Sequence, residues 1–429
     1  MAPAHPFRSA SAFTRRGWLQ SSLAAAAACL AGCSGLASGD RSKQHAGARR
    51  LFYTSAGRTW WIDANQAQPV PKALEFQAPD QMTWQPTGFF RDGRVLMLSM
   101  ETRQDGPGRP FDQYYTLTKT HIWRGNPETG ALEELATHDR MAVFETPALL
   151  LPGDERMLIQ VAKPGSGKIY NVRLDGSDAH EFTREGDGFP YGLSASPDGR
   201  RIAFHTAGPS PHSYRIWTAD PEGGHRVLIA ADAAHLFFAP MWSPDGRRLL
   251  FQDCRHHEDP GHDWADLCIA SAEGGGMQRI TEDQGAWFGA TYGPADRKGG
   301  GSNVPQWMPD GSVVFSARIP GSRVPWSYQS NRADTDHFNR EFLPAESRGG
   351  TYACRLDPRT GTKTPLTAPE PGRWDFRVTP TPDGRWIAFC RCRTGESPSL
   401  WIMHADGTGA RELSRGHEAT GADHPRWIP

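Results

Sequence analysis

The segment 191–229 carries the pattern that most limits how this chain can fold. Its central part, Ser194–Phe204, reads Ser-Ala-Ser-Pro-Asp-Gly-Arg-Arg-Ile-Ala-Phe. Pro-Asp-Gly is typical of a tight turn, because proline presets φ and glycine accepts a positive φ. The short alternating or apolar runs on either side are typical of β-strands. Two further runs, 214–220 and 225–229, are separated by Pro-Glu-Gly-Gly. The segment therefore predicts four short strands joined by tight hairpin turns.

The same unit recurs along the chain, which indicates a repeat architecture. First hairpins are predicted at six places: 82–100, 147–162, 191–206, 238–253, 304–317 and 376–391. Second hairpins are predicted at seven places: 60–76, 122–136, 169–183, 216–229, 267–281, 352–367 and 400–414. The missing first strand is found at the far end, where His424–Trp427 matches Ala239–Trp242. The strand that should follow it is Arg50–Thr54, near the start of the chain.

This circular match predicts an all-β fold, a seven-bladed β-propeller of four-stranded antiparallel blades. The C-terminal strand, His424–Trp427, would join the N-terminal blade and close the ring, which removes an open sheet edge. Two packed sandwiches would not account for the match between the two ends. The 46 glycines, 35 prolines and 15 tryptophans suit such a fold. A net charge of -1 gives no electrostatic footprint for nucleic acid.

The N-terminal region has the features of an export leader. Thr14–Gln20 resembles a twin-arginine signal, and an apolar run too short for a permanent membrane anchor follows at Leu23–Ala31. Leu-Ala-Gly-Cys, ending at Cys33, resembles a bacterial lipobox, and an ordinary cleaved signal peptide is the alternative. We predict a signal peptide at 1–32, a lipidated tether at 33–49 and the propeller at 50–429. The predicted location is the cell envelope, periplasmic or outer-membrane attached, with the lipid on Cys33 in the membrane.

Five cysteines remain beyond the leader, and none of their spacings matches a zinc motif. An exported protein can form disulfides, so a bond between Cys254 and Cys268 stays open at this stage.

The repeat unit resembles those of TolB and its relatives. The likeness rests on Pro197–Phe204, Pro382–Phe389 and Leu400–Ser414. It covers the whole predicted mature chain and implies the propeller fold. Propellers with such repeats serve as scaffolds, peptidase caps and lyases, so the resemblance leaves these functions open. One of them is a non-enzymatic envelope scaffold that binds a protein partner.

Long insertions fall on one face of the predicted propeller, where the connections between blades lie. Functional residues concentrate on loops that a rigid scaffold presents. The aromatic faces and the Arg and His edges in these loops suit an acidic saccharide or a similar ligand. The candidate ligand-binding residues are Trp264, Trp287, Trp326, His337, Arg340 and Arg377.

A second resemblance concerns the loop His257–Asp266, which reads His-Glu-Asp-Pro-Gly-His-Asp-Trp-Ala-Asp. It is similar to the His-rich loop of oligogalacturonate lyases, which are seven-bladed propellers. The likeness implies cleavage of uronic-acid chains by β-elimination at a manganese site built from His and Gln. At that metal site this chain departs from the family: Asn303 stands near a family histidine, and Phe376–Val378 aligns with its His-Pro-His sequence.

β-Elimination needs a group that neutralises the uronate, a base and an acid. Arg323 or Arg377 could meet the carboxylate, and His257 and His262 could act as base or acid. Tyr292 or Tyr328 could donate the proton. His235 and His424 could hold a divalent metal such as manganese, together with Asn303. No nucleophile elbow, Walker loop or dinucleotide fingerprint is present, so serine hydrolases, NTPases and dehydrogenases lack support.

Overall fold

The computed structural model describes residues 50–56, 58–76, 82–101, 120–138, 148–163, 166–187, 189–207, 214–255, 263–328 and 340–428. The predicted leader with Cys33, and the predicted site residues His257, His262 and His337, lie outside these ranges. Within them the chain is almost entirely β, and the 3-10 helix η2 (Pro344–Glu346) is the one helix described. In the same ranges, no helix has the length and hydropathy needed to span a bilayer.

Four antiparallel sheets contain four strands each. The first consists of β1 (Arg50–Ser55), β2 (Arg58–Asp63), β3 (Lys72–Ala73) and β31 (Asp423–Trp427). The second consists of β4 (Met82–Phe89), β5 (Val95–Glu101), β6 (Thr120–Gly125) and β7 (Leu132–His138). The third consists of β8 (Leu149–Leu150), β9 (Arg156–Lys163), β10 (Ser166–Arg173) and β11 (His180–Glu181). The fourth consists of β12 (Phe189–Ala195), β13 (Ile202–Ala207), β14 (Tyr214–Ala219) and β15 (Val227–Ala231).

The next part of the chain forms a single 13-stranded sheet, where the repeats had predicted separate blades. Its strands are β16 (His235–Trp242), β17 (Arg248–Arg255), β18 (Trp264–Ser271), β19 (Gln278–Arg279), β20 (Ala286–Trp287), β21 (Gln306–Trp307), β22 (Val313–Arg318), β25 (Thr351–Asp357), β26 (Thr362–Pro365), β27 (Arg373–Pro380), β28 (Trp386–Arg393), β29 (Ser399–His404) and β30 (Arg411–Glu412). A separate hairpin joins β23 (Trp326–Tyr328) to β24 (Arg340–Phe342).

Inside the large sheet, antiparallel pairing follows three sets: β16 to β19, then β21, β22, β25 and β26, and finally β27 to β30. β20 links the first set to the second by pairing with both β18 and β22. A parallel pair between β25 and β27, at Thr351 and Trp374, links the second set to the third. Short extra pairings between neighbouring four-stranded units therefore merge them into one sheet.

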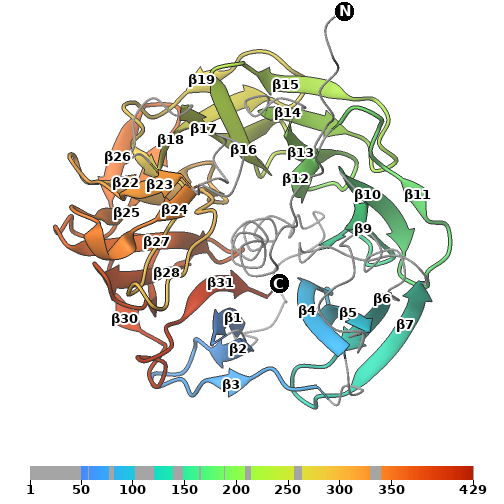
Figure 1. Cartoon of the computed structure of the whole chain (residues 1–429), viewed down its shortest axis with the longest axis horizontal. Coiled ribbons are helices and arrows are strands. Elements are labelled where there is room, and N and C mark those ends of the chain that lie inside the picture. The colour runs from blue at the N-terminus through green and yellow to red at the C-terminus, as the bar shows by residue number, and fades with distance from the viewer. Residues whose placement is uncertain are drawn as a thin grey trace, which may run out of the picture.

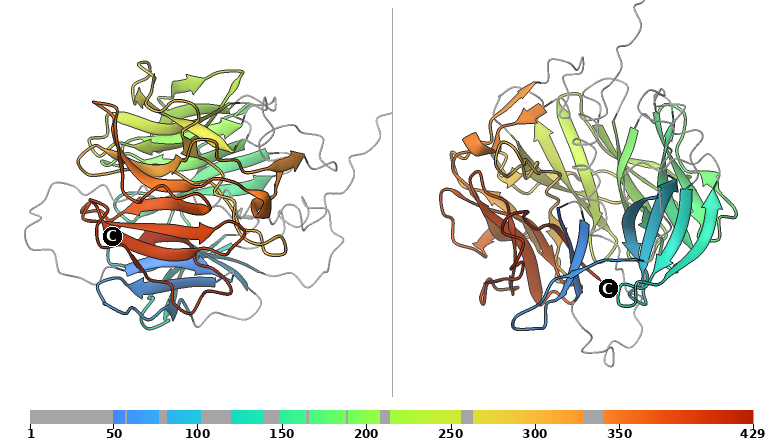
Figure 2. Two further views of the ribbon diagram at one scale, coloured as in Figure 1. Left: turned by 90° about the vertical axis from the view of Figure 1, so that its left-hand side faces the viewer. Right: turned by 60° about the horizontal axis from the view of Figure 1, so that its bottom comes forward.

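The sheets are arranged around a common centre, as a β-propeller (Figure 1). In the side view, on the left of Figure 2, the strands run roughly horizontally, across the thickness of the molecule. β31 lies beside β1 in Figure 1, and the two strands pair antiparallel, with Leu51 opposite Trp427 and Phe52 opposite Arg426. The last strand of the chain thus belongs to the same sheet as the first.

The predicted Pro-Asp-Gly turn is present between β12 and β13. Ser196 Oγ donates to Asp198 Oδ1 at 2.6 Å, and the Gly199 amide donates to the Ser196 carbonyl at 2.8 Å. Gly199 adopts a φ of 71°, which explains why glycine stands there. The hydroxyl–carboxylate contact recurs in the turns 243–246 and 381–384. The serine or threonine two residues before each aspartate is therefore part of the turn.

An irregularity that the repeats did not predict occurs on the strands β12, β16, β27 and β31. Each of them has a register shift in its pairing. One residue at each shift has a positive φ: Gly192 (63°), Ala239 (51°), Arg377 (51°) and His424 (56°). A positive φ costs roughly 1–2 kcal/mol for a non-glycine residue. Arg377 and His424 thus adopt a strained backbone at the same repeat position, a feature that clusters at functional sites.

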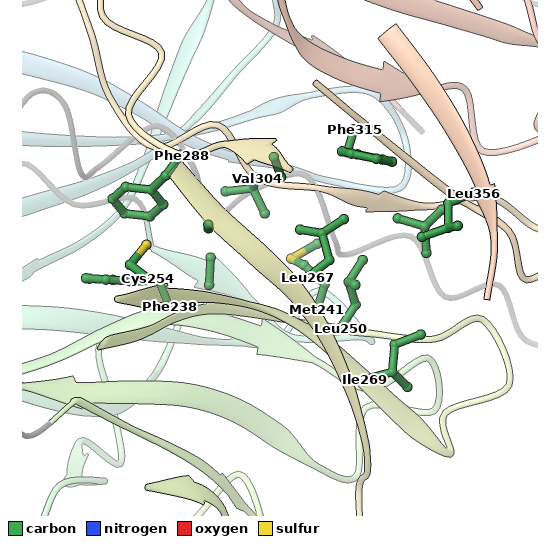
Figure 3. Close-up of a cluster of buried hydrophobic side chains, with 14 of the residues drawn as sticks. Phe238, Met241, Leu250, Cys254, Leu267, Ile269, Phe288, Val304, Phe315 and Leu356 are labelled. Atoms are coloured by element: carbon green, nitrogen blue, oxygen red, sulfur yellow. The ribbon is translucent and has the colours of Figure 1, made fainter. Parts of the chain in front are cut away.

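The largest part of the core lies between neighbouring four-stranded sets. One cluster combines Phe238 and Leu250, from the set β16 to β19, with Phe315 and Leu356, from β22 and β25 (Figure 3). Cys254 lies in the same cluster, and all five cysteines in the described ranges are free and buried. The disulfide between Cys254 and Cys268 that the sequence left open is therefore not formed. Packing between sets, rather than cross-linking, stabilises the ring.

Gly192 is expected to tolerate no side chain. A Cβ there would lie 2.6 Å from His205 Nδ1, and His205 is buried. Gly192→Ala should lower the free energy of unfolding by about 2–4 kcal/mol, from backbone strain plus overpacking. Gly276 has the same φ of 63° with nothing within 4 Å of a Cβ, so Gly276→Ala measures strain alone. Equal losses in urea denaturation of the two variants would contradict the steric argument.

Candidate functional site

Asp423, at the start of β31, is the centre of a buried polar cluster. Its Oδ1 accepts from Arg377 Nε at 2.5 Å and from the His424 amide at 2.7 Å. The Cys390 thiol lies 3.5 Å from the same oxygen. Oδ2 accepts from the Tyr292 hydroxyl and lies 3.2 Å from His424 Nδ1. The residue is only 4% exposed, so these contacts replace water around its carboxylate. We call Asp423, Arg377, Tyr292, His424 and Cys390 the Asp423 cluster.

Arg377 brings a second segment of the chain into contact with the cluster. Its backbone amide donates to Asn303 Oδ1 at 2.7 Å, and its Nη1 donates to the Ser302 carbonyl at 2.6 Å. Asn303 is in turn fixed by donation from its amide to the Trp287 carbonyl at 2.9 Å. Arg377 Nη2 is buried and has no hydrogen-bond partner among the described residues. A buried donor left without a partner costs about 1–3 kcal/mol, so this nitrogen requires an explanation.

The contacts of His424 determine which of its ring nitrogens carries the proton. Thr54 Oγ1 donates its one proton to the Asp423 carbonyl at 3.1 Å and lies 3.3 Å from His424 Nδ1. The Asp423 carboxylate beside Nδ1 can only accept, and the hydroxyl is able to accept as well. Nδ1 then carries the proton, and Nε2 presents a lone pair. Nε2 is also buried and unpartnered within the described ranges.

Burial and charge set the protonation of the cluster. Burial alone would raise the pKa of Asp423, but the charge of Arg377 and the contact with Tyr292 hold that pKa at about 2. Burial and the charge of Arg377 lower the pKa of His424 to about 3, in spite of the nearby carboxylate. Burial and the Asp423 charge raise the pKa of Tyr292 well above its usual value. At neutral pH the cluster thus contains a guanidinium, a carboxylate, a neutral imidazole and a protonated phenol.

The structure brings together three residues that the sequence had singled out separately: Tyr292, Arg377 and His424. The sequence analysis missed Asp423, the residue that joins them. An alignment of the repeats would have identified Asp423. It directly precedes the positive-φ residue of its repeat, and the equivalent residues in two other repeats are the aromatic Tyr191 and Phe238. A charged residue at a position that is aromatic in other repeats was the available signal.

His235, the other predicted metal ligand, belongs to a different network. Its Nδ1 lies 2.6 Å from Asp253 Oδ1, and Asp253 also accepts from Arg279 at 2.7 Å. Arg279 further pairs with Asp266 at 3.6 Å. This network shares no residue with the Asp423 cluster, so the two histidines have different partners.

The three predicted ligand-stacking tryptophans are buried. Trp264, Trp287 and Trp326 are 2%, 1% and 8% exposed. Trp264 and Trp287 pack against each other and against Trp374, with ring centroids 4.8–6.4 Å apart. In this arrangement they form an internal aromatic cluster next to Asn303, rather than an exposed platform.

The remaining predicted residues lie on the loops around the second set of the large sheet. Arg323 is exposed, and its backbone pairs with Arg348. Tyr328 and Arg340 are opposite each other in the β23–β24 hairpin, where the structure describes their backbone only.

The cluster does not suit the manganese that the resemblance to lyases implies. Both Asp423 oxygens already accept hydrogen bonds from protein groups, and the adjacent Arg377 guanidinium would repel a divalent cation. In the described ranges, no three His, Cys, Asp or Glu side chains are placed to hold a metal. Of the two predicted ligands, only His424 belongs to the cluster, and it contacts Asp423 through Nδ1.

Comparison with known proteins supports the fold. No protein-family model matches the chain. The uncharacterized protein Atu1656 of Agrobacterium fabrum (strain C58) is 26% identical over 207 residues, 47% of this chain and 66% of that protein, slightly under two thirds of its length. An oligogalacturonate lyase solved in complex with manganese is 15% identical, with a TM-score of 0.51 over 86% of each chain. TolB from Acinetobacter baumannii is 15% identical, with a TM-score of 0.43 over 87% of this chain and 79% of TolB.

The sheets described above, together with the likeness to the oligogalacturonate lyase, define the class of protein, a β-propeller built from antiparallel four-stranded sheets. Both families that the sequence motifs resembled, TolB and the oligogalacturonate lyases, are among its structural neighbours. At such low identity the neighbours establish the fold alone, and function has to be argued from the residues of this chain.

Proposed function

We propose that this protein is an exported, lipid-anchored, seven-bladed propeller that binds an acidic saccharide on its loop-bearing face. The four separate sheets and the three sets of the large sheet would be the seven blades, with β31 closing the ring against β1. Lipidation at Cys33 would hold the propeller at the cell envelope. The reaction that we propose for the bound saccharide is β-elimination at a uronate.

The observation that carries this proposal is the buried Arg377 guanidinium within the Asp423 cluster. A guanidinium held by one carboxylate, with a further N–H group unpartnered, is suited to meet the carboxylate of a uronate. Neutralising that carboxylate makes the C5 proton easier to remove. A base then takes this proton, the C4–O bond breaks, and the leaving oxygen takes up a proton.

The proton transfers are assigned to fewer groups than the sequence analysis allowed. The Tyr292 hydroxyl already donates its proton to Asp423, so it is a positioning residue in this arrangement. His257 and His262, which lie outside the described ranges, remain the candidates for base and acid.

The assay that tests the enzyme follows the ultraviolet absorbance of the unsaturated uronate product. We expect pectin-, ulvan- or heparin-type oligomers to give this product, and Arg377→Gln to lower kcat/KM by at least about 100-fold. Absence of product from all three classes, with and without manganese, would contradict elimination. Equilibrium binding of the same oligomers separates a binding protein from an enzyme.

The second candidate function is a non-enzymatic envelope scaffold for a protein partner. It is favoured by the burial of Trp264, Trp287 and Trp326, which leaves these rings unavailable for stacking on a sugar. If no oligomer binds the folded protein, this function replaces the first.

A further inference from the structure

A cavity of about 420 Å³ lies between the first and second sets of the large sheet, on the side of the hairpin turns. Arg247 and Arg248 line it where the β16–β17 turn enters β17, and Pro358, which follows β25, lines it from the second set. The two sets are neighbours around the ring (Figure 1). Both arginines therefore border one space, and its volume suits a small ligand.

An equivalent arginine in the preceding repeat shows how a guanidinium is paired at this position. Arg201 and Arg248 have the same place in their turns, because the backbone amide of each donates to a serine hydroxyl oxygen at 2.9 Å. The Arg201 guanidinium donates to Glu273 Oε1 at 3.2 Å and to the Thr218 hydroxyl oxygen. Its charge is thus balanced by a carboxylate from the next set around the ring.

Both of these acceptors are replaced at Arg248. Ile269 stands in the place of Thr218, because each pairs with the residue two positions after the arginine of its repeat. Arg359 stands in the place of Glu273, because each lies two positions after the last residue of its strand, β25 or β18. An apolar side chain and a second cation therefore occupy the positions that hold a hydroxyl and a carboxylate at the preceding junction.

The surroundings of Arg248 leave its guanidinium without a balancing acceptor. No group in the described part of the chain accepts a hydrogen bond from it, and its Cζ lies 5.3 Å from the centroid of the Trp307 ring. The carboxylate of Asp357 pairs with Arg359 at 3.1 Å. Asp245 also lines the cavity, but its Oδ1 accepts two hydrogen bonds within its own turn. The cavity thus presents an excess of positive charge.

We propose that this cavity binds a phosphate group, carried either by a small soluble ester or by a lipid headgroup. A carboxylate has two oxygens, and one guanidinium fork satisfies both of them. A phosphate monoester has three terminal oxygens and up to two negative charges, which match the two guanidinium groups of Arg247 and Arg248. Ile269 and Pro358 supply apolar surface for the organic part of the ligand. This site is separate from the Asp423 cluster and does not rest on the proposed function.

The test is calorimetric titration of the purified full chain at low ionic strength. We expect glycerol 3-phosphate to bind, and glycerol and acetate to bind at least about tenfold more weakly. Dibutyryl phosphatidic acid, a soluble lipid with the same phosphate monoester, distinguishes the two sources. Tighter binding of glycerol 3-phosphate assigns a soluble ester, and tighter binding of dibutyryl phosphatidic acid assigns a lipid headgroup.

Three variants place the binding in this cavity. Arg248→Gln removes one charged fork, so we expect it to weaken glycerol 3-phosphate binding by at least about tenfold. Arg201→Gln is the matched control at the equivalent repeat position, and it should change the Kd by less than about threefold, since Glu273 already pairs with Arg201. Arg359→Glu restores a carboxylate at the junction, on a side chain that is 78% exposed. It should weaken binding by at least about tenfold and leave the melting temperature unchanged.

The contrary results are equally specific. If neither phosphate ester binds the folded protein, the proposal is wrong. Acetate that binds as tightly as glycerol 3-phosphate shows a general attraction of anions and also overturns it. Equal losses from Arg248→Gln and Arg201→Gln place the binding elsewhere on the molecule. The uronate assays described above address a different site, so failure of phosphate binding leaves the proposed function intact.

Discussion

Asp423→Asn is expected to lower the free energy of unfolding by about 3–5 kcal/mol, because it leaves the buried Arg377 charge without its partner. The carboxylate also accepts from Tyr292 and from the His424 amide, and an amide side chain cannot replace all of these acceptors. Its strand, β31, pairs with β1, so the loss falls on the sheet that combines the first and last described strands. Replacing one carboxylate oxygen of Asp423 by an amide nitrogen should therefore cause a large decrease in the free energy of unfolding.

Urea denaturation followed by tryptophan fluorescence measures the loss. Asp178→Asn is the control, since Asp178 forms a similar pair with Arg156 at 2.7 Å but its side chain is 65% exposed. That exposed pair should contribute less than about 1 kcal/mol. If Asp423→Asn and Asp178→Asn lower the free energy of unfolding equally, the Asp423 cluster does not stabilise the pairing of β31 with β1.

Stability is expected to fall by about 3 kcal/mol between pH 7 and pH 4 through His205 alone. Burial lowers the pKa of His205 to about 3, against about 6.5 in the unfolded chain. Between these values the unfolded state binds a proton that the folded state excludes, so stability rises with pH. The contribution is complete above about pH 6.5 and is lost as the pH falls towards 3. Protonation would place a charge among Tyr191, Tyr214 and Phe238.

His205→Phe should reduce this dependence by about 3 kcal/mol and leave the part that comes from His424, whose pKa is also lowered to about 3. This holds even if its stability at pH 7 differs from that of the parent protein. The measurement is the unfolding free energy at a series of pH values, and the quantity compared is its slope. His225→Asn is the control, because the His225 side chain is 91% exposed and asparagine suits its positive φ. A slope that His205→Phe leaves unchanged would show that other groups cause the acid lability.

Local features of the fold were predictable because they depend on residues close together in the chain. The Pro-Asp-Gly turns were expected from proline and glycine alone, and the structure adds the contact between Ser196 and Asp198. The strands around them were expected from their short apolar runs. The merging of three sets into one sheet was not predictable, because β20 and the Thr351–Trp374 bridge depend on how neighbouring sets approach each other.

The candidate site was predictable only in part. Arg377, Tyr292 and His424 were predicted from the chemistry of their side chains. Arg377 is 46 positions and Tyr292 131 positions from Asp423 in the sequence, and His424 is its direct neighbour. Nothing in the spacing of these residues shows that one carboxylate joins them. The exposed tryptophan platform was also expected from residue type, and Trp264 and Trp287 are instead buried.

The repeat of turn and strand residues by itself determined the class of fold, because each copy specifies its hairpins through local backbone preferences. Only the tertiary structure decided the site. The register shifts at Arg377 and His424 displace one residue of each strand, and the packing of β27 against β31 then brings Asp423, which precedes His424, against Arg377. Such contacts depend on strand register and on burial, which arise only when distant segments pack together.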